Sequence, residues 1–240
     1  KLLGYRSVRL ALVILFLLPW IWSFAPALDK VYGLVLTSMW QMPALSLLTV
    51  MQFILPLLVG MTAAELLGAE VSAGTLAPLL LRPLERYKAL GAKYVVALLY
   101  PLVLLSVLLL SSLLGGFAGG TGFGEGGFIG LGFLEPLQAL GQIVRSYFIA
   151  GATLAPIAAL ALMFSVIYMN TAAAALATIA TLNILRLLVV FPWLEGWLLT
   201  SYLDAYVGTP ATLLKALVIL LLYTVAIMAV GLYIFEKKDL

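Results

Sequence analysis

Long apolar runs separated by short polar stretches occupy most of the chain. The runs last about 20 residues and do not alternate, whereas the strands of a membrane barrel alternate over about ten residues. The pattern therefore predicts an all-α membrane protein built as a bundle of six transmembrane helices. The predicted spans are residues 10–24, 44–67, 94–114, 147–168, 171–191 and 213–235.

Spans two, three and four carry Pro56, Pro101 and Pro156, and we expect Pro56 to kink span two. In span five, residues 172–180 are almost all Ala and Thr, and such small side chains let helices approach closely in lipid. Residues 192–210 contain several Trp and Tyr side chains beside acidic groups, a composition typical of the membrane interface.

Between spans three and four lies a glycine-rich stretch, residues 115–132, with ten glycines in eighteen positions. So many glycines predict a flexible external loop. Gly122, Gly124 and Gly127 fit the dinucleotide fingerprint G-x-G-x-x-G. That fingerprint needs a preceding strand and a following crossover helix, and the flanks here are membrane spans, so we expect no nucleotide to bind there.

Composition supports the membrane assignment and removes most catalytic chemistry. The chain is 65% hydrophobic and 10% charged, which leaves too little polar surface to cover a soluble globule. With no Cys and no His, we expect neither a metal site nor a catalytic residue. The phosphate-binding G-x-x-x-x-G-K-[ST] motif is absent from the sequence, and the net charge of +3 says nothing about nucleic acid.

The distribution of Lys and Arg predicts the orientation, because cytoplasmic loops carry the excess of positive charge. One side collects nine cations and the other four. The nine are Lys1, Arg6, Arg9, Arg82, Arg86, Lys88, Lys93, Lys237 and Lys238, and the four are Lys30, Arg145, Arg186 and Lys215. We therefore expect a multi-pass protein of the cell (inner) membrane with both termini in the cytoplasm.

The stretch from Glu65 to Lys93 is the most polar part of the chain, with seven of its 23 charged residues. A charge at the bilayer centre costs at least about 2.5 kcal/mol, so this cluster is expected outside the hydrocarbon. Its leucines suit a short helix that lies against the membrane or is held by a partner. The alternative is an ordinary positively charged loop.

Three further polar residues lie at or near the predicted spans: Glu65, Asn183 and Arg186. They are possible pathway residues, since charges within a membrane usually face a cavity or a partner. The favoured interpretation is structural. In it Glu65 ends span two at the cytoplasmic surface, Arg186 extends to the outer headgroups, and Asn183 forms a hydrogen bond between helices.

One run in the charged stretch resembles the signature E-x-x-x-G-T-L-x-x-L-L-x-R-P-x-x-R-x-x-x-x-G-K of type-2 ATP-binding-cassette (ABC) exporter permeases. The matching residues are Glu70, Gly74, Thr75, Leu76, Leu79, Leu80, Arg82, Pro83, Arg86, Gly91 and Lys93, with Ala92 inserted before the final lysine. The run follows span two, as in that family, and residues 236–240 are similar to the family's usual ending. One departure is Ser72 and Ala73 before Gly74, where many members carry charged or polar residues.

The resemblance implies that residues 1–240 form a single transmembrane permease domain, with a cytoplasmic coupling helix between spans two and three within a coupling element at residues 68–88. It also implies a separate cytoplasmic ATPase that holds ATP and Mg, while this chain has no cofactor and is not an enzyme. A second permease subunit is expected, as a homodimer joined through spans one and five, with spans two and five lining the pathway. The cargo would move outward, and the apolar spans slightly favour lipids, amphiphiles or drugs.

Two other classes remain open. An ion-gradient-driven carrier or channel would need buried acidic residues for coupling, and none is expected at midspan. The other class is a membrane scaffold that recruits an ATPase without transporting anything. Transport from sealed vesicles with ATP, against a control with a gradient alone, separates these classes.

Overall fold

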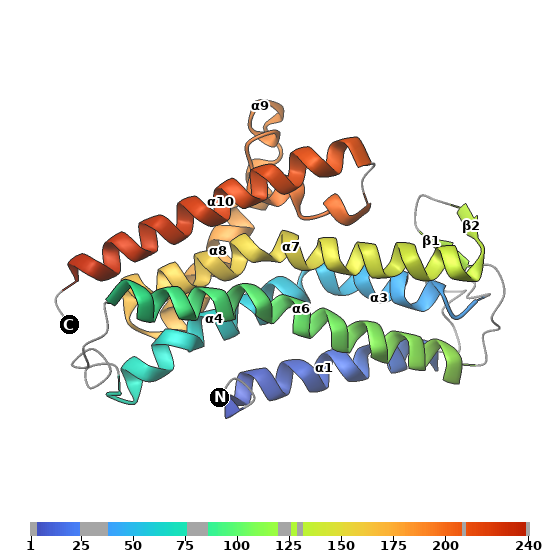
Figure 1. Ribbon diagram of the computed structural model, residues 1–240, viewed down its shortest axis with the longest axis horizontal. Helices are drawn as coiled ribbons and strands as arrows, with labels where there is room; N and C mark the ends of the chain where they lie inside the picture. The colour runs from blue at the N-terminus through green and yellow to red at the C-terminus, as the bar shows by residue number, and fades with distance from the viewer. Residues whose placement is uncertain are drawn as a thin grey trace. The chain divides into compact units, whose positions relative to one another are not determined.

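The computed structural model describes residues 4–24, 38–75, 86–119, 126–128, 132–207 and 210–238. Helices account for nearly all of it (Figure 1). In chain order the elements are α1 (Arg6–Ser23), α3 (Gln41–Gln52), α4 (Ile54–Ser72), α6 (Arg86–Ala118), β1 (Gly126–Phe128), β2 (Gly132–Leu134), α7 (Pro136–Tyr168), α8 (Thr171–Leu188), α9 (Pro192–Glu195), the 3-10 helices η2 (Leu199–Tyr202) and η3 (Ala205–Val207), and α10 (Pro210–Lys237).

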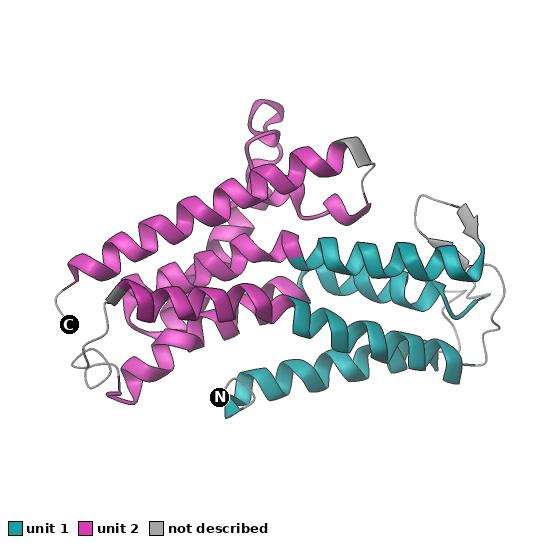
Figure 2. Ribbon diagram, viewed as in Figure 1, with its two compact units in different colours: residues 1–54, 102–151 teal, residues 55–101, 152–240 magenta. Residues whose placement is uncertain are grey.

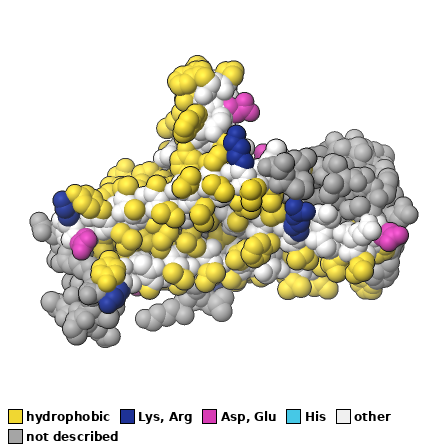
Figure 3. All heavy atoms as spheres, turned by 45° about the horizontal axis from the view of Figure 1, so that its top comes forward, with side chains coloured by type: hydrophobic (Ala, Val, Ile, Leu, Met, Phe, Trp, Pro, Cys, Tyr) yellow, Lys and Arg dark blue, Asp and Glu magenta, His cyan; other side chains and the backbone are white. Residues whose placement is uncertain are grey.

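Six helices within the described residues are long and apolar enough to cross a membrane. They are Arg6–Ser23, Ile54–Ser72, Tyr87–Ala118, Pro136–Tyr168, Thr171–Leu188 and Thr212–Lys237. Large apolar side chains stay exposed on them, such as Leu10 on α1, Leu187 on α8 and Leu221 on α10. Hydrophobic side chains also predominate on the face drawn in Figure 3. The prediction of an all-α membrane protein with six spanning helices is confirmed.

Span two differs from its predicted bounds. A break at Phe53, with φ −143° and ψ −47°, divides the predicted helix 44–67 into α3 and α4. Pro56 explains the position of the break, because in a continuous helix its ring would clash with the carbonyl of Gln52, four residues earlier. The helix then continues to Ser72, five residues beyond the predicted end at residue 67.

Spans three and four are much longer than predicted. The helices α6 and α7 have 33 residues each, which is about 50 Å at 1.5 Å per residue and exceeds the roughly 30 Å of a hydrocarbon core. Pro101 lies inside α6 and Pro156 inside α7. Both helices therefore extend beyond the bilayer or cross it with a tilt.

Part of the glycine-rich stretch is ordered in a way that the sequence did not predict. Helix α6 continues through Ala118, and β1 pairs antiparallel with β2, with Gly127 opposite Phe133. A Cβ on Gly116 would lie 2.8 Å from the carbonyl oxygen of Met39, so this glycine allows a close approach between two segments. The other residues of the stretch, 120–125 and 129–131, lie outside the described part of the chain.

The chain divides into two compact units (Figure 2). Unit 1 comprises residues 1–54 and 102–151, and unit 2 comprises residues 55–101 and 152–240. The sequence predicted a single domain. Since α6 and α7 each contribute residues to both units, no linker separates them along the chain, and composition alone could not reveal the division.

Hydroxyl groups join the helices of unit 1. The Ser23 hydroxyl donates to the carbonyl of Gly115, and the Ser111 hydroxyl donates to that of Phe16, so two bonds connect α1 with α6. The buried Tyr147 hydroxyl donates to the Pro43 carbonyl at 2.9 Å and connects α7 with α3. Side chains thus satisfy carbonyl groups that would have no water partner in lipid.

Small residues bring α4 and α8 together in unit 2. A Cβ on Gly60 would meet the Thr178 methyl group at 3.4 Å, and a Cβ on Gly68 would lie 2.7 Å from the backbone nitrogen of Thr171. The inward face of α8, which includes Ala174 and Thr178, is buried. Close packing by the Ala and Thr residues of span five is confirmed, but the packing partner is α4 of the same chain.

Candidate functional site

The predicted coupling element, residues 68–88, begins in the last turn of α4 and ends in the first turn of α6. The middle of it, including Leu76, Leu79, Leu80, Arg82 and Pro83, lies outside the described residues, as does the side chain of Arg86, the first residue of α6. Glu70, Gly74 and Thr75 are described. The structure thus shows how the chain enters and leaves the stretch of residues 76–85, which we call segment 76–85.

Gly74 and Thr75 end α4 in a Schellman motif. Gly74 has a φ of +66°, a left-handed conformation that glycine adopts without strain. The amide of Thr75 donates to the carbonyl of Glu70, and the amide of Gly74 donates to that of Val71, both at 3.0 Å. The Thr75 hydroxyl also donates to the Glu70 carbonyl, at 3.2 Å. These bonds satisfy the last carbonyls of α4 and give both residues a local structural role.

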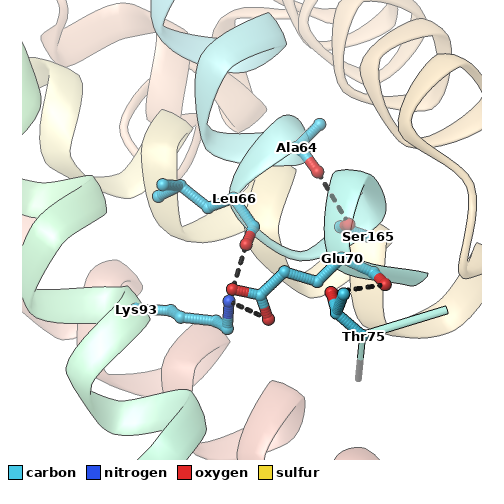
Figure 4. A network of polar contacts seen from close by, with 6 residues as sticks. All are labelled: Ala64, Leu66, Glu70, Thr75, Lys93 and Ser165. Atoms are coloured by element: carbon cyan, nitrogen blue, oxygen red, sulfur yellow. Dashed lines mark hydrogen bonds and ion pairs between the residues drawn. The ribbon is translucent and has the colours of Figure 1, made fainter. Parts of the chain in front are cut away.

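An ion pair joins α4 to α6, the helices before and after segment 76–85 (Figure 4). The Lys93 amine on α6 lies 2.6 Å from the Glu70 carboxylate on α4 and donates to the Leu66 carbonyl at 2.7 Å. The Lys93 side chain is only 13% exposed and that of Glu70 is 30% exposed, so water screens the pair only in part. We call this contact the Glu70–Lys93 clamp. It holds the end of α4 against the start of α6.

The turn between α7 and α8 lies at the same end of unit 2. Met169 has a φ of +50°, and the Asn170 side chain caps α8 by accepting from the amides of Ala172 and Ala173 at 2.9 and 3.1 Å. The close approach of Gly68 to Thr171 places this turn beside the last turn of α4. Movement of α4 at this end would therefore press directly on the start of α8.

The end of α10 is attached to the same region. The Lys238 amine donates to the carbonyls of Val166 and Ile167 at 2.8 and 2.6 Å, and so provides a cation at the negative end of the α7 dipole. Lys237 lies over the ring of Tyr233, and Lys88 on α6 lies over the ring of Tyr87. Lys88, Lys237 and Lys238 therefore place positive charge at the start of α6 and the ends of α7 and α10, and an acidic protein surface or anionic lipid would complement them.

Glu65 lies inside α4, seven residues before its end, which is about 10 Å along the helix. The helix of span two does not end near Glu65, because α4 continues to Ser72. The position of Glu65 at the cytoplasmic surface stays a prediction. One turn earlier, the buried Thr62 hydroxyl donates to the Tyr100 hydroxyl at 3.1 Å, and Glu65 interacts electrostatically with Tyr100. A carboxyl group next to paired hydroxyls inside a membrane helix is suited to bind a proton or a polar group.

Asn183 and Arg186 lie far from Glu65. The Asn183 amide donates to the Ile179 carbonyl at 3.0 Å within α8, rather than between helices as expected. Arg186 lies in the last turn of α8, where a cation interacts favourably with the helix dipole. The contact of Gly60 with Thr178 sets the alignment of α4 with α8 and separates Asn183 from the level of Glu65 by about 15 Å. The three possible pathway residues do not form one site.

Sequence reasoning missed three residues of this region. Lys93 belongs to the quoted signature, but the signature gave no reason to pair it with Glu70. Lys238 was counted only as a cytoplasmic charge, and nothing in the local sequence distinguished Gly68 from other helical glycines. Gly91 remains unexplained within the chain, because a Cβ there would meet no atom within 4 Å among the described residues.

Comparison with known proteins gives one family and one relative. The chain is 29% identical over 197 residues to the Uncharacterized protein YhcI of Bacillus subtilis (strain 168). The alignment covers 74% of this chain and 62% of that protein, so the chain spans less than two thirds of the length of this relative. The model of the family described as Protein of unknown function (DUF2705) matches residues 10–240. Because the match covers nearly the whole chain, this protein belongs to the DUF2705 family.

Proposed function

We propose that this chain is the membrane subunit of an ATP-driven exporter and that its segment 76–85 docks on a separate cytoplasmic ATPase, which binds ATP and Mg. The Glu70–Lys93 clamp carries the proposal. It joins α4 to α6, the helices on either side of the segment, so a partner that moves one of them would move the other. Two helices without this contact could move independently.

The packing of α4 supports transmission of such a movement through unit 2. The Ser165 hydroxyl on α7 donates to the Ala64 carbonyl on α4 at 2.8 Å. On its other side α4 contacts Thr178 and Thr171 of α8 through Gly60 and Gly68, with no α4 side chain in between. A displacement of α4 would therefore reach α7 and α8 directly, and tightly packed interfaces shift between discrete arrangements rather than deform.

A second copy of the chain belongs to this proposal. The small face of α8 is taken by α4, so it is not available for a dimer contact. The opposite face of α8 carries the exposed side chains of Leu176, Ile184 and Leu187. We propose that a homodimer would use this face together with α1, which is mostly exposed as well.

Capture of an ATPase tests the docking step. Each ATPase encoded beside the gene is co-expressed with the full chain, and replacement of Thr75 by Arg with Leu76 by Glu should abolish co-purification. The matched control is Gln138→Arg, which adds a cation at an exposed site at the start of α7. Circular dichroism of each variant checks that the helices remain. Equal capture by the wild type and the double variant would contradict the proposal.

A second candidate is an ion-gradient-driven carrier, and the position of Glu65 inside α4 favours it. Glu65→Gln keeps the size of the side chain and removes its charge. If a proton gradient drives transport, the transport rate of this variant in sealed vesicles without ATP should fall at least about tenfold. Proton transfer by a positioned carboxyl group contributes that much or more. Transport that needs ATP and persists in Glu65→Gln would instead support the exporter.

A further inference from the structure

An open groove of about 620 Å³ lies in unit 2 between α10 and the turn that follows α9. Helix α10 contributes Lys215, Ile219, Tyr223 and Ala226, which follow one another at intervals of four, four and three residues. This spacing places them along one face of the helix. Gly196 and Trp197 form the opposite wall.

Hydrogen bonds hold the wall of the groove in place. The Tyr223 hydroxyl on α10 donates to the Trp197 carbonyl, and the Tyr202 hydroxyl donates to the Gly196 carbonyl at 2.7 Å. In the same connection between α8 and α10, Tyr206 is buried, and this burial, together with the nearby Asp204 charge, raises the pKa of its phenol. Tyr206 is thus neutral. The hydrogen bonds of Tyr223 and Tyr202 form the groove wall without any ligand.

The groove has one charged end. Lys215 is exposed and is the cation among its lining residues, and it forms no ion pair with any residue that the structure describes. From Lys215 to Ala226 the floor extends about 16 Å along α10 and contains only apolar groups and the Tyr223 ring. A ligand that fits this surface has an anionic head and a long apolar tail.

The depth of the groove in the membrane agrees with its polarity. Lys215 lies five residues after the start of α10, about 8 Å along the helix, at the level where a lysine amine reaches the headgroups. The adjoining segment presents the exposed side chains of Trp193 and Trp197, rings that favour the same level. Ala226 lies near the middle of the candidate span Thr212–Lys237, where the surrounding lipid would be hydrocarbon.

We propose that this groove binds one anionic phospholipid, with its phosphate at the Lys215 amine and an acyl chain along Ile219, Tyr223 and Ala226. A soluble anion would leave the apolar floor unused, and the apolar side chain of a second protein copy would leave Lys215 without a counter-ion. The site goes beyond the proposed export function, because it requires neither an ATPase nor a cargo.

Quenching of Trp197 fluorescence tests the site in the full-length chain. The chain has five Trp residues, and changing the other four to Phe leaves Trp197 as the sole reporter. The protein is reconstituted in vesicles with a small fraction of phosphatidylglycerol or phosphatidylcholine that is brominated on its acyl chains. We expect about a fivefold preference for phosphatidylglycerol, the contribution of one lysine to binding an anionic headgroup.

Variants at Lys215 separate a site from general attraction to charge. Lys215→Ala should abolish the preference, Lys215→Arg should keep it, and Lys237→Ala, which removes a cation at the other end of α10, should also keep it. Ala226→Phe should reduce quenching by both lipids, because it fills the apolar part of the groove and adds no second Trp to the reporter. Equal quenching by the two lipids in the Trp197 reporter, or a preference that survives Lys215→Ala, would overturn the proposal.

Discussion

Lys93 shows how one side chain can determine the geometry of a whole segment. Its amine contacts the Glu70 carboxylate and the Leu66 carbonyl, so it satisfies a charge and a backbone group at once. The pair is more buried than a surface salt bridge and less buried than a core pair. Loss of the pair should therefore lower the free energy of unfolding by an amount between the values for surface and buried salt bridges, on the order of 2 kcal/mol.

We predict that Lys93→Met lowers the midpoint of thermal unfolding in detergent by about 4–8 °C, because Glu70 is left partly buried without its partner. Lys88→Ala removes an exposed cation from the same helix and should change the midpoint by less than about 2 °C. The double variant Glu70→Gln with Lys93→Met should recover most of the loss. Equal midpoints for Lys93→Met and the wild type would show that the clamp contributes nothing.

The second prediction at this scale concerns Gly68. A Cβ there would lie 2.7 Å from the nitrogen and 2.9 Å from the Cα of Thr171, and these backbone atoms cannot rotate away. Gly68→Ala should therefore destabilise the protein by about 2–3 kcal/mol. Gly141→Ala is the control, since a Cβ at Gly141 meets no atom within 4 Å and alanine favours a helix. Similar unfolding midpoints for both variants would contradict the close contact of α4 with α8.

At the scale of elements, hydropathy predicted six helices but not their ends. Nothing in the apolar pattern marks Phe53 as a break, and only the proline three residues later indicates it. Helices α6 and α7 exceed their predicted spans because moderately polar residues at their ends are compatible with a helix outside the hydrocarbon. A hydropathy window finds the residues that are apolar enough to lie in lipid. The end of a helix depends instead on where the backbone hydrogen bonds of the helix stop.

The end of α4 allows a sharper test. Gly74→Ala places a Cβ on a residue with φ +66°, which costs about 1–2 kcal/mol and weakens the Schellman bonds. We predict that Gly74→Ala speeds hydrogen exchange at the amides of residues 74 and 75 and leaves exchange at the other amides unchanged. We also predict weaker ATPase capture. Gly74→Asn, which tolerates the left-handed conformation better, should behave more like the wild type. Unchanged exchange in Gly74→Ala would refute the structural role of this glycine.

For the whole molecule, the sequence predicted the class of protein but neither the two units nor the contacts between the helices near segment 76–85. The class follows from composition, which is a property of the whole chain. The clamp and the contact between Gly68 and Thr171 depend on how distant segments align, and a single sequence carries no record of that alignment. The signature marked the segment because its resemblance to exporter permeases extends over many residues.

Orientation is the prediction that belongs to the whole molecule. The chain has no Cys, so single Cys substitutions can be labelled without background. Ala73→Cys, at the end of α4, should react with a membrane-impermeant maleimide only from the cytoplasmic side of inner-membrane vesicles. Asp204→Cys, between η2 and η3, should react only from the other side, and both native residues are exposed. The opposite labelling result would place segment 76–85 outside the cell and exclude a cytoplasmic ATPase as its partner.

The ion pair between α4 and α6 has one more consequence. It closes a ring around the 22 residues that separate Glu70 from Lys93. The conformational entropy of closing that ring is lost when the protein folds, so a binding partner does not have to bring the ends together. A single proteolytic cut between residues 76 and 85 would leave two new chain ends, attached to helices that the ion pair still joins. The cut protein would keep α4 and α6 aligned, but the two parts of the proposed binding segment would no longer be connected.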